Sequence, residues 1–183
     1  MNENDAQGLQ NFFTSGNDFI NGSSDSDILF GYKGNDSIAG NGGSDTIYGG
    51  FGKDTLRGDG GSDLLDGGDG KDSLYGGSGA DSFTFANKLS SSNLDTIADF
   101  SSGEDVICLL SLIFNRLSGD TDLRDNLVVG SKALDANDYL IFNPSNGILS
   151  YDSDGSGNAN SVGFVKLTGI YDFDATDLEV ISG

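Results

Sequence analysis

The feature that most constrains this chain is an aspartate that recurs every nine residues. Eight of them follow one another without a slip in spacing: Asp18, Asp27, Asp36, Asp45, Asp54, Asp63, Asp72 and Asp81. An apolar residue stands two positions after each aspartate, and a glycine stands five positions before every one except the first. A fixed period of this kind indicates a structure built from stacked, similar units. Residues 13–84 are therefore interpreted as eight units of nine residues.

Each unit combines a turn with a short strand. The first six residues are rich in Gly, Asn, Asp and Ser, which tolerate the backbone conformations of tight turns. The last three alternate outward, inward and outward, as in Thr46-Ile47-Tyr48, which is typical of a very short strand with one buried side chain. Two units complete one winding of 18 residues, so alternate units stack as parallel strands. The expected buried rows are Ile20, Ile38, Leu56 and Leu74 on one side and Leu29, Ile47, Leu65 and Phe83 on the other.

Stacking every 18 residues also brings the carboxylates of alternate units together. The chain carries 29 acidic and 9 basic side chains, a net charge of −20, and no basic residue is interleaved at the stacked positions. Carboxylates and exposed carbonyl groups are ligands of hard cations. Ca²⁺ accepts them in a flexible geometry, whereas Mg²⁺ requires a stricter octahedron. Histidine is absent and cysteine occurs once, which argues against softer metals.

Three stacked pairs on each of two edges predict about six Ca²⁺ ions. The predicted ligands are the eight aspartates together with turn glycines that offer carbonyl oxygens: Gly34, Gly43, Gly50, Gly52, Gly61, Gly68, Gly70, Gly77 and Gly79. One buried apolar side chain for every nine ordered residues is too little to hold a fold. We therefore expect metal binding to supply folding free energy, with the segment disordered when calcium is absent. The alternative is a disordered acidic linker, but a linker has no reason to keep aspartates and apolar residues in phase.

The units resemble the Gly-Gly-x-Gly-x-Asp-x-apolar-x nonapeptide of RTX proteins, the hemolysin-type calcium-binding repeat. Residues 49–57, 67–75 and 76–84 match this pattern in full. The first unit departs with Phe13-Thr14 and the second with Asp25, so the pairs Asp18–Asp36 and Asp27–Asp45 are the least regular. The resemblance implies an all-β fold, a right-handed parallel β-roll with calcium between successive turns, followed by a β-rich capping domain.

The period ends after Thr84, and the following region is expected to cap the open end of the roll. A short helix is predicted over 110–117. Strand-like runs follow the pattern of alternating or β-branched residues over 96–100, 105–109, 139–142, 148–151, 162–167 and 178–181. Segments 95–100, 103–107 and 149–157 are similar to the C-terminal region of type I secreted RTX proteins. That likeness implies an uncleaved export signal at the C-terminus, and the ending 177–183 is compatible with one.

The predicted organisation is thus a flexible N-terminal segment over 1–12, the roll over 13–84, and a capping and secretion-signal region over 85–183. For the acidic segment 152–158 a hairpin loop is favoured over a calcium site, because it lacks the spacing of an EF-hand. For Asp95, Asp99 and Asp105 a solvated or capping role is favoured over an extra ion at the junction.

The composition excludes several classes of function. A polyanion is repelled by nucleic acid and by anionic membranes, and without histidine there is no Ser-His-Asp triad or histidine zinc site. The longest apolar stretch, 106–114, is too short to span a bilayer, and no N-terminal secretory signal is visible.

We therefore expect a non-enzymatic, calcium-folded module of a secreted, extracellular bacterial protein that assists type I export. Its expected partners are calcium and a type I exporter. Two alternatives stay open. One is an extracellular adhesion or carbohydrate-binding module for a polysaccharide or cell-surface ligand. The other is a fragment of a secreted hydrolase or epimerase whose catalytic part is absent.

Overall fold

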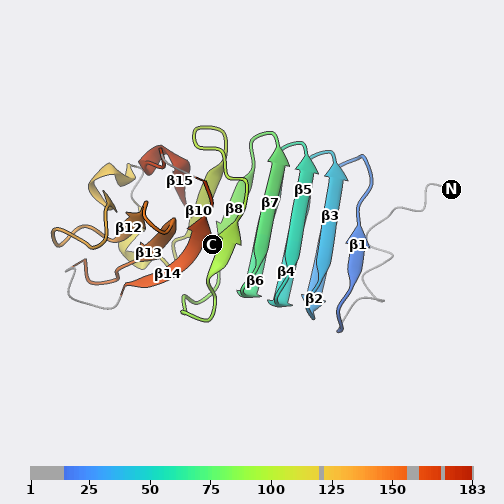
Figure 1. Ribbon diagram of the computed structural model, residues 1–183, viewed down its shortest axis with the longest axis horizontal. Coiled ribbons are helices and arrows are strands. Elements are labelled where there is room, and N and C mark those ends of the chain that lie inside the picture. The colour runs from blue at the N-terminus through green and yellow to red at the C-terminus, as the bar shows by residue number, and fades with distance from the viewer. Residues whose placement is uncertain (1–14, 120–121, 156–160, 170–171, 183) are drawn as a thin grey trace.

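In the computed structural model the chain forms an elongated body made almost entirely of strands (Figure 1). The structure describes residues 15–119, 122–155, 161–169 and 172–182. The segment 1–12, predicted to be flexible, lies outside the described residues. Within the described part of the chain, the helical elements are three 3₁₀ turns of three residues each: η1 (Asn115–Leu117), η2 (Leu123–Asp125) and η3 (Ala175–Asp177).

The repeat region winds as a flattened coil in which alternate strands stack. One side is formed by β1 (Phe19–Asn21), β3 (Ser37–Gly42), β5 (Thr55–Gly60) and β7 (Ser73–Ser78). The other is formed by β2 (Ile28–Lys33), β4 (Thr46–Gly52), β6 (Leu64–Gly70) and β8 (Ser82–Phe85). All of these pairings are parallel, and Ile38 pairs with Leu56 while Ile47 pairs with Leu65. The predicted winding of 18 residues and both predicted rows of buried side chains are confirmed, and the architecture is a parallel β-roll.

The strands are longer than the sequence pattern predicts. β2 to β7 span six or seven residues, whereas a strand of three was expected. The difference arises because residues after each triplet, many of them glycine, also pair with the next winding, as Gly50 does with Gly68. Each strand therefore buries two positions, for example Leu56 and Gly58 in β5. A side chain at Gly58 would collide with the carboxylate of Asp63, so that position must be glycine.

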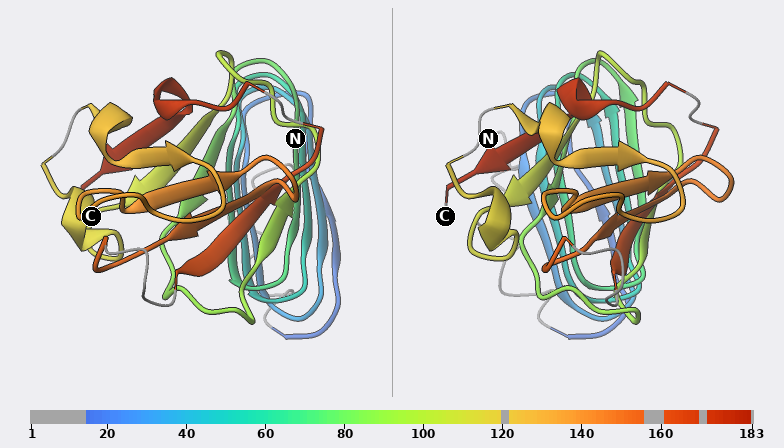
Figure 2. Two further views of the ribbon diagram at one scale, coloured as in Figure 1. Left: turned by 60° about the vertical axis from the view of Figure 1, so that its left-hand side comes forward. Right: turned by 90° about the vertical axis from the view of Figure 1, so that its left-hand side faces the viewer.

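The C-terminal region continues both sheets and then closes them. β9 (Asp95–Ile97) stacks on β7, while β10 (Val106–Leu110) stacks on β8 and is followed by β15 (Leu178–Ile181). β14 (Val162–Leu167) pairs with β9 and leads into β13 (Ile148–Tyr151), β12 (Leu140–Asn143) and β11 (Leu127–Val129). Seen end-on in Figure 2, the windings of the roll superpose and the C-terminal elements lie in front of them.

Two predictions about this region have different outcomes. The strands expected over 148–151, 162–167 and 178–181 are confirmed with the same bounds. The short helix expected over 110–117 is wrong, because 106–110 is strand β10 and helical structure is confined to η1. Leu110 is the last residue of that strand, and the segment then turns so that Phe114 and Leu117 are buried in the core while Leu112 stays exposed. Among the described residues no helix approaches the length and apolar character needed to cross a bilayer.

Candidate metal centre

The repeat aspartates link successive windings through their side chains. In each case the backbone N–H of one aspartate donates to Oδ1 of the aspartate 18 residues later, as Asp36 does to Asp54 at 2.7 Å. We call the eight repeat aspartates the aspartate ladder. Its six bonds measure 2.7–2.9 Å and start at Asp18, Asp27, Asp36, Asp45, Asp54 and Asp63. The six stacked pairs predicted from the sequence are therefore brought together.

The second carboxylate oxygen of most ladder residues has no partner. Oδ2 is buried and accepts no hydrogen bond in Asp18, Asp36, Asp45, Asp54, Asp63, Asp72 and Asp81. Asp27 differs because its Oδ2 accepts from the backbone N–H of Ser23 at 2.6 Å and from its hydroxyl at 2.9 Å. A buried, unpartnered carboxylate oxygen is costly. Because the same oxygen is without a hydrogen bond in seven ladder residues, the pattern indicates that these atoms bind a ligand.

The unpartnered oxygens converge with main-chain carbonyls of the next winding. A Cβ built on Gly31 would lie 2.6 Å from Asp36 Oδ2 and 2.5 Å from the Gly49 carbonyl oxygen. The same arrangement recurs at Gly49, where the two atoms belong to Asp54 and Gly67. We call each such space, beside the first glycine of a unit, a cradle. The cradles that combine a ladder Oδ2 with a carbonyl oxygen are those at Gly22, Gly31, Gly40, Gly49 and Gly58.

Among the described residues, no basic side chain forms an ion pair with a carboxylate of the ladder. Burial, with smaller contributions from neighbouring carboxylates, raises the pKa of Asp54 and Asp81 to about 6 and that of Asp72 to about 7. The backbone N–H on Oδ1 opposes this rise in pKa but does not cancel it. Within the described ranges the one ion pair joins Arg124 to Asp122, far along the sequence in the C-terminal region.

These residues fit a hard cation. Each cradle offers a carboxylate oxygen and a carbonyl oxygen with no basic side chain beside them, which is the donor set that Ca²⁺ prefers. No group of three carboxylates converges anywhere in the described part of the chain. A cation between the windings would therefore depend on main-chain carbonyls for much of its coordination.

The glycines predicted as ligands have a second role that the sequence did not show. The Gly34 carbonyl oxygen would lie 1.5 Å from a Cβ on Gly52, and that of Gly50 would lie 2.2 Å from one on Gly68. The glycines at the second and fourth positions of the units thus allow the backbones of stacked windings to approach closely. The sequence reasoning missed the glycines at the first position, which form the cradles. Their regular place five residues before every ladder aspartate except Asp18 was the available signal.

The ladder extends beyond the repeats. The N–H of Asp72 donates to Asp95 Oδ1 at 2.9 Å, and the N–H of Asp81 donates to Asp105 Oδ1 at 3.0 Å. Asp99 accepts from the N–H groups of Gly76 and Gly77. These three residues thus accept N–H groups of the last repeat windings, as expected of a cap, and the alternative of an extra ion at the junction stays a prediction.

The hairpin expected around 152–158 is also confirmed in its flanking strands, since β13 and β14 pair antiparallel. Residues 156–158 lie outside the described residues.

Comparisons with known proteins agree with the repeat pattern. A family profile described as the RTX calcium-binding nonapeptide repeat, in four copies, matches residues 14–47 and 48–83. The solution structure of the AlgE6R3 subunit of the mannuronan C5-epimerase from Azotobacter vinelandii is similar to the chain, with 22% sequence identity and a TM-score of 0.44. The match covers 91% of this chain and 79% of that one. No curated protein sequence matches the chain. The matched residues, which make up less than half of the chain, carry nonapeptides of the RTX calcium-binding type.

Proposed function

We propose that the chain is a calcium-folded module of a secreted protein, with about six Ca²⁺ ions between its stacked windings. The observation that carries this proposal is the row of seven buried Oδ2 atoms without a partner. Each ion would be held by Oδ2 of a ladder aspartate and by carbonyl oxygens of the cradle and turn glycines. The predicted glycine ligands, from Gly34 to Gly79, remain part of this proposal together with the first glycines of the units.

Calcium would supply the positive charge and the partner for Oδ2 that the side chains of the roll do not provide. A divalent cation offsets the repulsion between stacked carboxylates and gives the desolvated Oδ2 atoms a partner. The residues of the roll position these oxygens, through the ladder bonds and the close approach of glycines. Because the ions bind between windings that exist only in the folded chain, their binding free energy becomes folding free energy.

We further propose that the chain leaves the cell unfolded, through a type I exporter, and folds where calcium is abundant. The last strand, β15, pairs with β10 at the edge of the six-stranded sheet. An export signal in residues 177–183 would thus be extended and accessible before folding and largely part of a strand afterwards. The net charge of −20 favours an open chain while calcium is scarce.

The proposed role is non-catalytic. The carboxylates that the structure brings together are engaged by backbone N–H groups along the ladder, and their free oxygens face the cradles. Any hydrolase or epimerase activity of a longer protein would then reside in another part of it.

Circular dichroism with and without a calcium chelator tests the calcium-dependent fold. We expect the strand signal of the repeats to be lost in chelator and restored by Ca²⁺ but not by equimolar Mg²⁺. Equilibrium dialysis should give about six bound ions per chain. A strand signal that persists unchanged after complete removal of calcium contradicts the proposal.

The variant Asp54→Asn separates the ligand from the ladder bond. Asparagine keeps an oxygen to accept from the Asp36 N–H, but its NH₂ group replaces Oδ2 at the cradle. We expect the calcium concentration at half-folding to rise about tenfold, which corresponds to ~1.4 kcal/mol. The matched control is Asp59→Asn, which removes one charge from an exposed position of the same winding. An equal effect of the two variants would show that net charge, not coordination, is responsible.

A further inference from the structure

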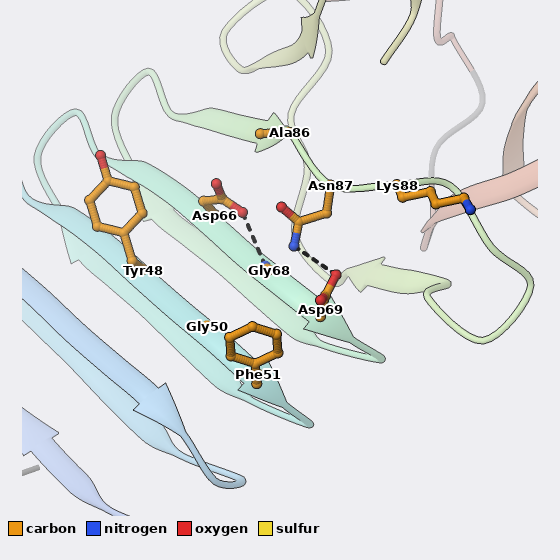
Figure 3. A pocket seen from close by; sticks show the side chains of 9 residues that line it. All are labelled: Tyr48, Gly50, Phe51, Asp66, Gly68, Asp69, Ala86, Asn87 and Lys88. Carbon is orange, nitrogen blue, oxygen red and sulfur yellow. Dashed lines mark hydrogen bonds between the residues drawn. The ribbon is translucent and has the colours of Figure 1, made fainter. Parts of the chain in front are cut away.

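A hollow of about 490 Å³ lies on the outer face of the six-stranded sheet. Its floor is glycine, because Gly50 and Gly68 are paired neighbours on β4 and β6 and carry no side chains. Tyr48 and Phe51 project from β4, and Asp66 and Asp69 project from β6 (Figure 3). The pairing places Tyr48 beside Asp66 and Phe51 beside Asp69. We call this hollow the trough; one side of it is aromatic and the other is acidic.

The aromatic side of the trough is held in a defined arrangement. The Tyr48 ring stacks on Phe30 of β2, with centroids 5.0 Å apart and an interplanar angle of 11°. Because β2 and β6 flank β4 on opposite sides, the other face of the Tyr48 ring is turned toward the trough. Phe51 is 58% exposed, an unusual position for a large apolar side chain in a sheet. Two ring faces are therefore available to a ligand without any rearrangement of the protein.

A strained residue supports this aromatic row. Tyr32 has φ +69°, a conformation that bulky residues rarely adopt, at the unit position where β4 and β6 have glycine. Its ring stacks on Phe30, with centroids 5.7 Å apart. Asn41 and Asp59 have φ +76° and +70° at the same position of their units, so the turn of the winding sets this conformation, and the half-buried Tyr32 ring extends the aromatic row beside the trough.

The polar groups around the trough include both donors and acceptors. Asp66 Oδ1 accepts from the Gly68 N–H at 3.0 Å, and Asp69 Oδ1 accepts from Asn87 Nδ2 at 3.0 Å. Oδ2 of each carboxylate has no hydrogen bond to the described residues, and Lys88 adds a donor at the rim. Hydroxyl groups, which donate and accept, match such a mixed set.

We propose that the trough binds a neutral oligosaccharide. Sugar rings present apolar C–H faces that stack on Tyr48 and Phe51, and hydroxyl groups that bond to Asp66, Asp69 and Asn87. Pockets that orient a ligand by a few polar groups beside aromatic faces are the usual form of small-ligand sites. The charge of the chain selects against acidic polysaccharides, which both the two trough carboxylates and the net charge of −20 repel. This binding goes beyond calcium-dependent folding, since no ladder residue lines the trough.

Isothermal titration in saturating calcium tests the proposal. The probes are short oligomers of glucose, mannose and galactose, with an oligouronate and an amino-sugar oligomer as the charged arms. We expect saturable binding of at least one neutral series. Tyr48→Ala and Phe51→Ala should each weaken that binding about tenfold, because each removes a stacking face.

Matched controls lie on the opposite sheet. Tyr75 of β7, which lies 4.1 Å below the guanidinium of Arg57, and the 83% exposed Phe19 of β1 are outward aromatics away from the trough. Tyr75→Ala and Phe19→Ala should leave binding unchanged. Every variant is first shown by circular dichroism to fold at the calcium concentration of the parent, so that a failure of calcium-dependent folding is distinguished from a failure of sugar binding.

Three results would overturn the proposal. The first is that none of the neutral oligomers binds to the folded chain. The second is that only the acidic or only the amino-bearing oligomer binds, which would assign the surface to charge alone. The third is that the control variants weaken binding as much as the trough variants do.

Discussion

The roll and the C-terminal region are continuous in their sheets but are held together differently. Each unit of the roll buries one large side chain, mostly aliphatic, and alternate units supply the two rows, as Leu56 and Leu65 do. The C-terminal region packs aromatic rings against one another, with Phe114 lying 5.1 Å from both Phe164 and Tyr151 between ring centroids. Two parts of the same sheets can therefore share their strand pairing and still differ in the interactions that stabilise them. Under the proposed function, the roll depends on Ca²⁺ between its windings, whereas the C-terminal region depends on a hydrophobic core.

The two regions meet where β9 and β10 pair with the last strands of the roll. Ile97 of β9 pairs with Leu74, and Ile107 of β10 pairs with Phe83, so the buried rows of the roll run into the C-terminal core. Asp95 and Asp105 accept the last N–H groups of the ladder. The C-terminal region thus provides one further winding, although its spacing does not follow the nine-residue period.

The largest expected effect comes from separating the two regions. A chain of residues 1–84 should fail to fold at any calcium concentration, because β7 and β8 become open edges and the N–H groups of Asp72 and Asp81 lose their acceptors. Calcium-titrated circular dichroism measures this. A chain of residues 1–110, which restores β9 and β10, should recover part of the signal. If residues 1–84 fold at the same calcium concentration as the full chain, the C-terminal region is not a cap.

A smaller effect distinguishes the two kinds of core. Leu56→Ala in the roll and Phe164→Ala in the C-terminal region each empty a fully buried site and should cost about 2–5 kcal/mol. Calcium titrations and urea unfolding should separate them: the roll variant raises the calcium requirement, whereas the C-terminal variant lowers the urea midpoint even in saturating calcium. The exposed Leu112→Ala is the control, with a change within about 0.5 kcal/mol. Indistinguishable calcium requirements for the two core variants would contradict the comparison.

The smallest expected effect is a pH dependence that changes sign with calcium. Burial raises the pKa of Asp72 to about 7 and that of Asp95 to about 8 in the folded chain, from an ordinary value of 3.8. Without calcium, the folded chain therefore binds more protons than the unfolded chain between about pH 4 and pH 8. The stability that these groups contribute is complete below about pH 4 and is lost as the pH rises through their folded pKa values.

We therefore expect acidification from pH 8 to pH 4 to increase the strand signal of the calcium-free chain. In calcium the same acidification should raise the calcium concentration needed for folding, because protons compete for the carboxylates. Circular dichroism across this pH range, with and without calcium, measures both. The variant Asp72→Asn should reduce the calcium-free response. A pH dependence with the same sign in both conditions would contradict the role assigned to the buried carboxylates.

Periodic features of the fold were predictable, and features that depend on a break in the period were not. The pairing of Ile38 with Leu56 follows from the 18-residue winding alone. The fifth winding was hidden, because Asp95 follows Asp72 by 23 residues and Asp105 follows Asp81 by 24, although both begin an Asp-x-apolar triplet. The pairing of Tyr48 with Asp66 also follows from the 18-residue winding. Asn87 lies beyond the last unit, so its contact with Asp69 and the hollow that they help to enclose could not be inferred from the period.

The direction of the ladder bonds makes the two ends of the roll unequal. Every winding receives its acceptor oxygens from the winding that follows it in the chain. At the C-terminal end the N–H groups of Asp72 and Asp81 are already satisfied by Asp95 and Asp105. At the other end Asp18 and Asp27 stand first in the ladder, so an added winding would stack there by donating its N–H groups to these two carboxylates.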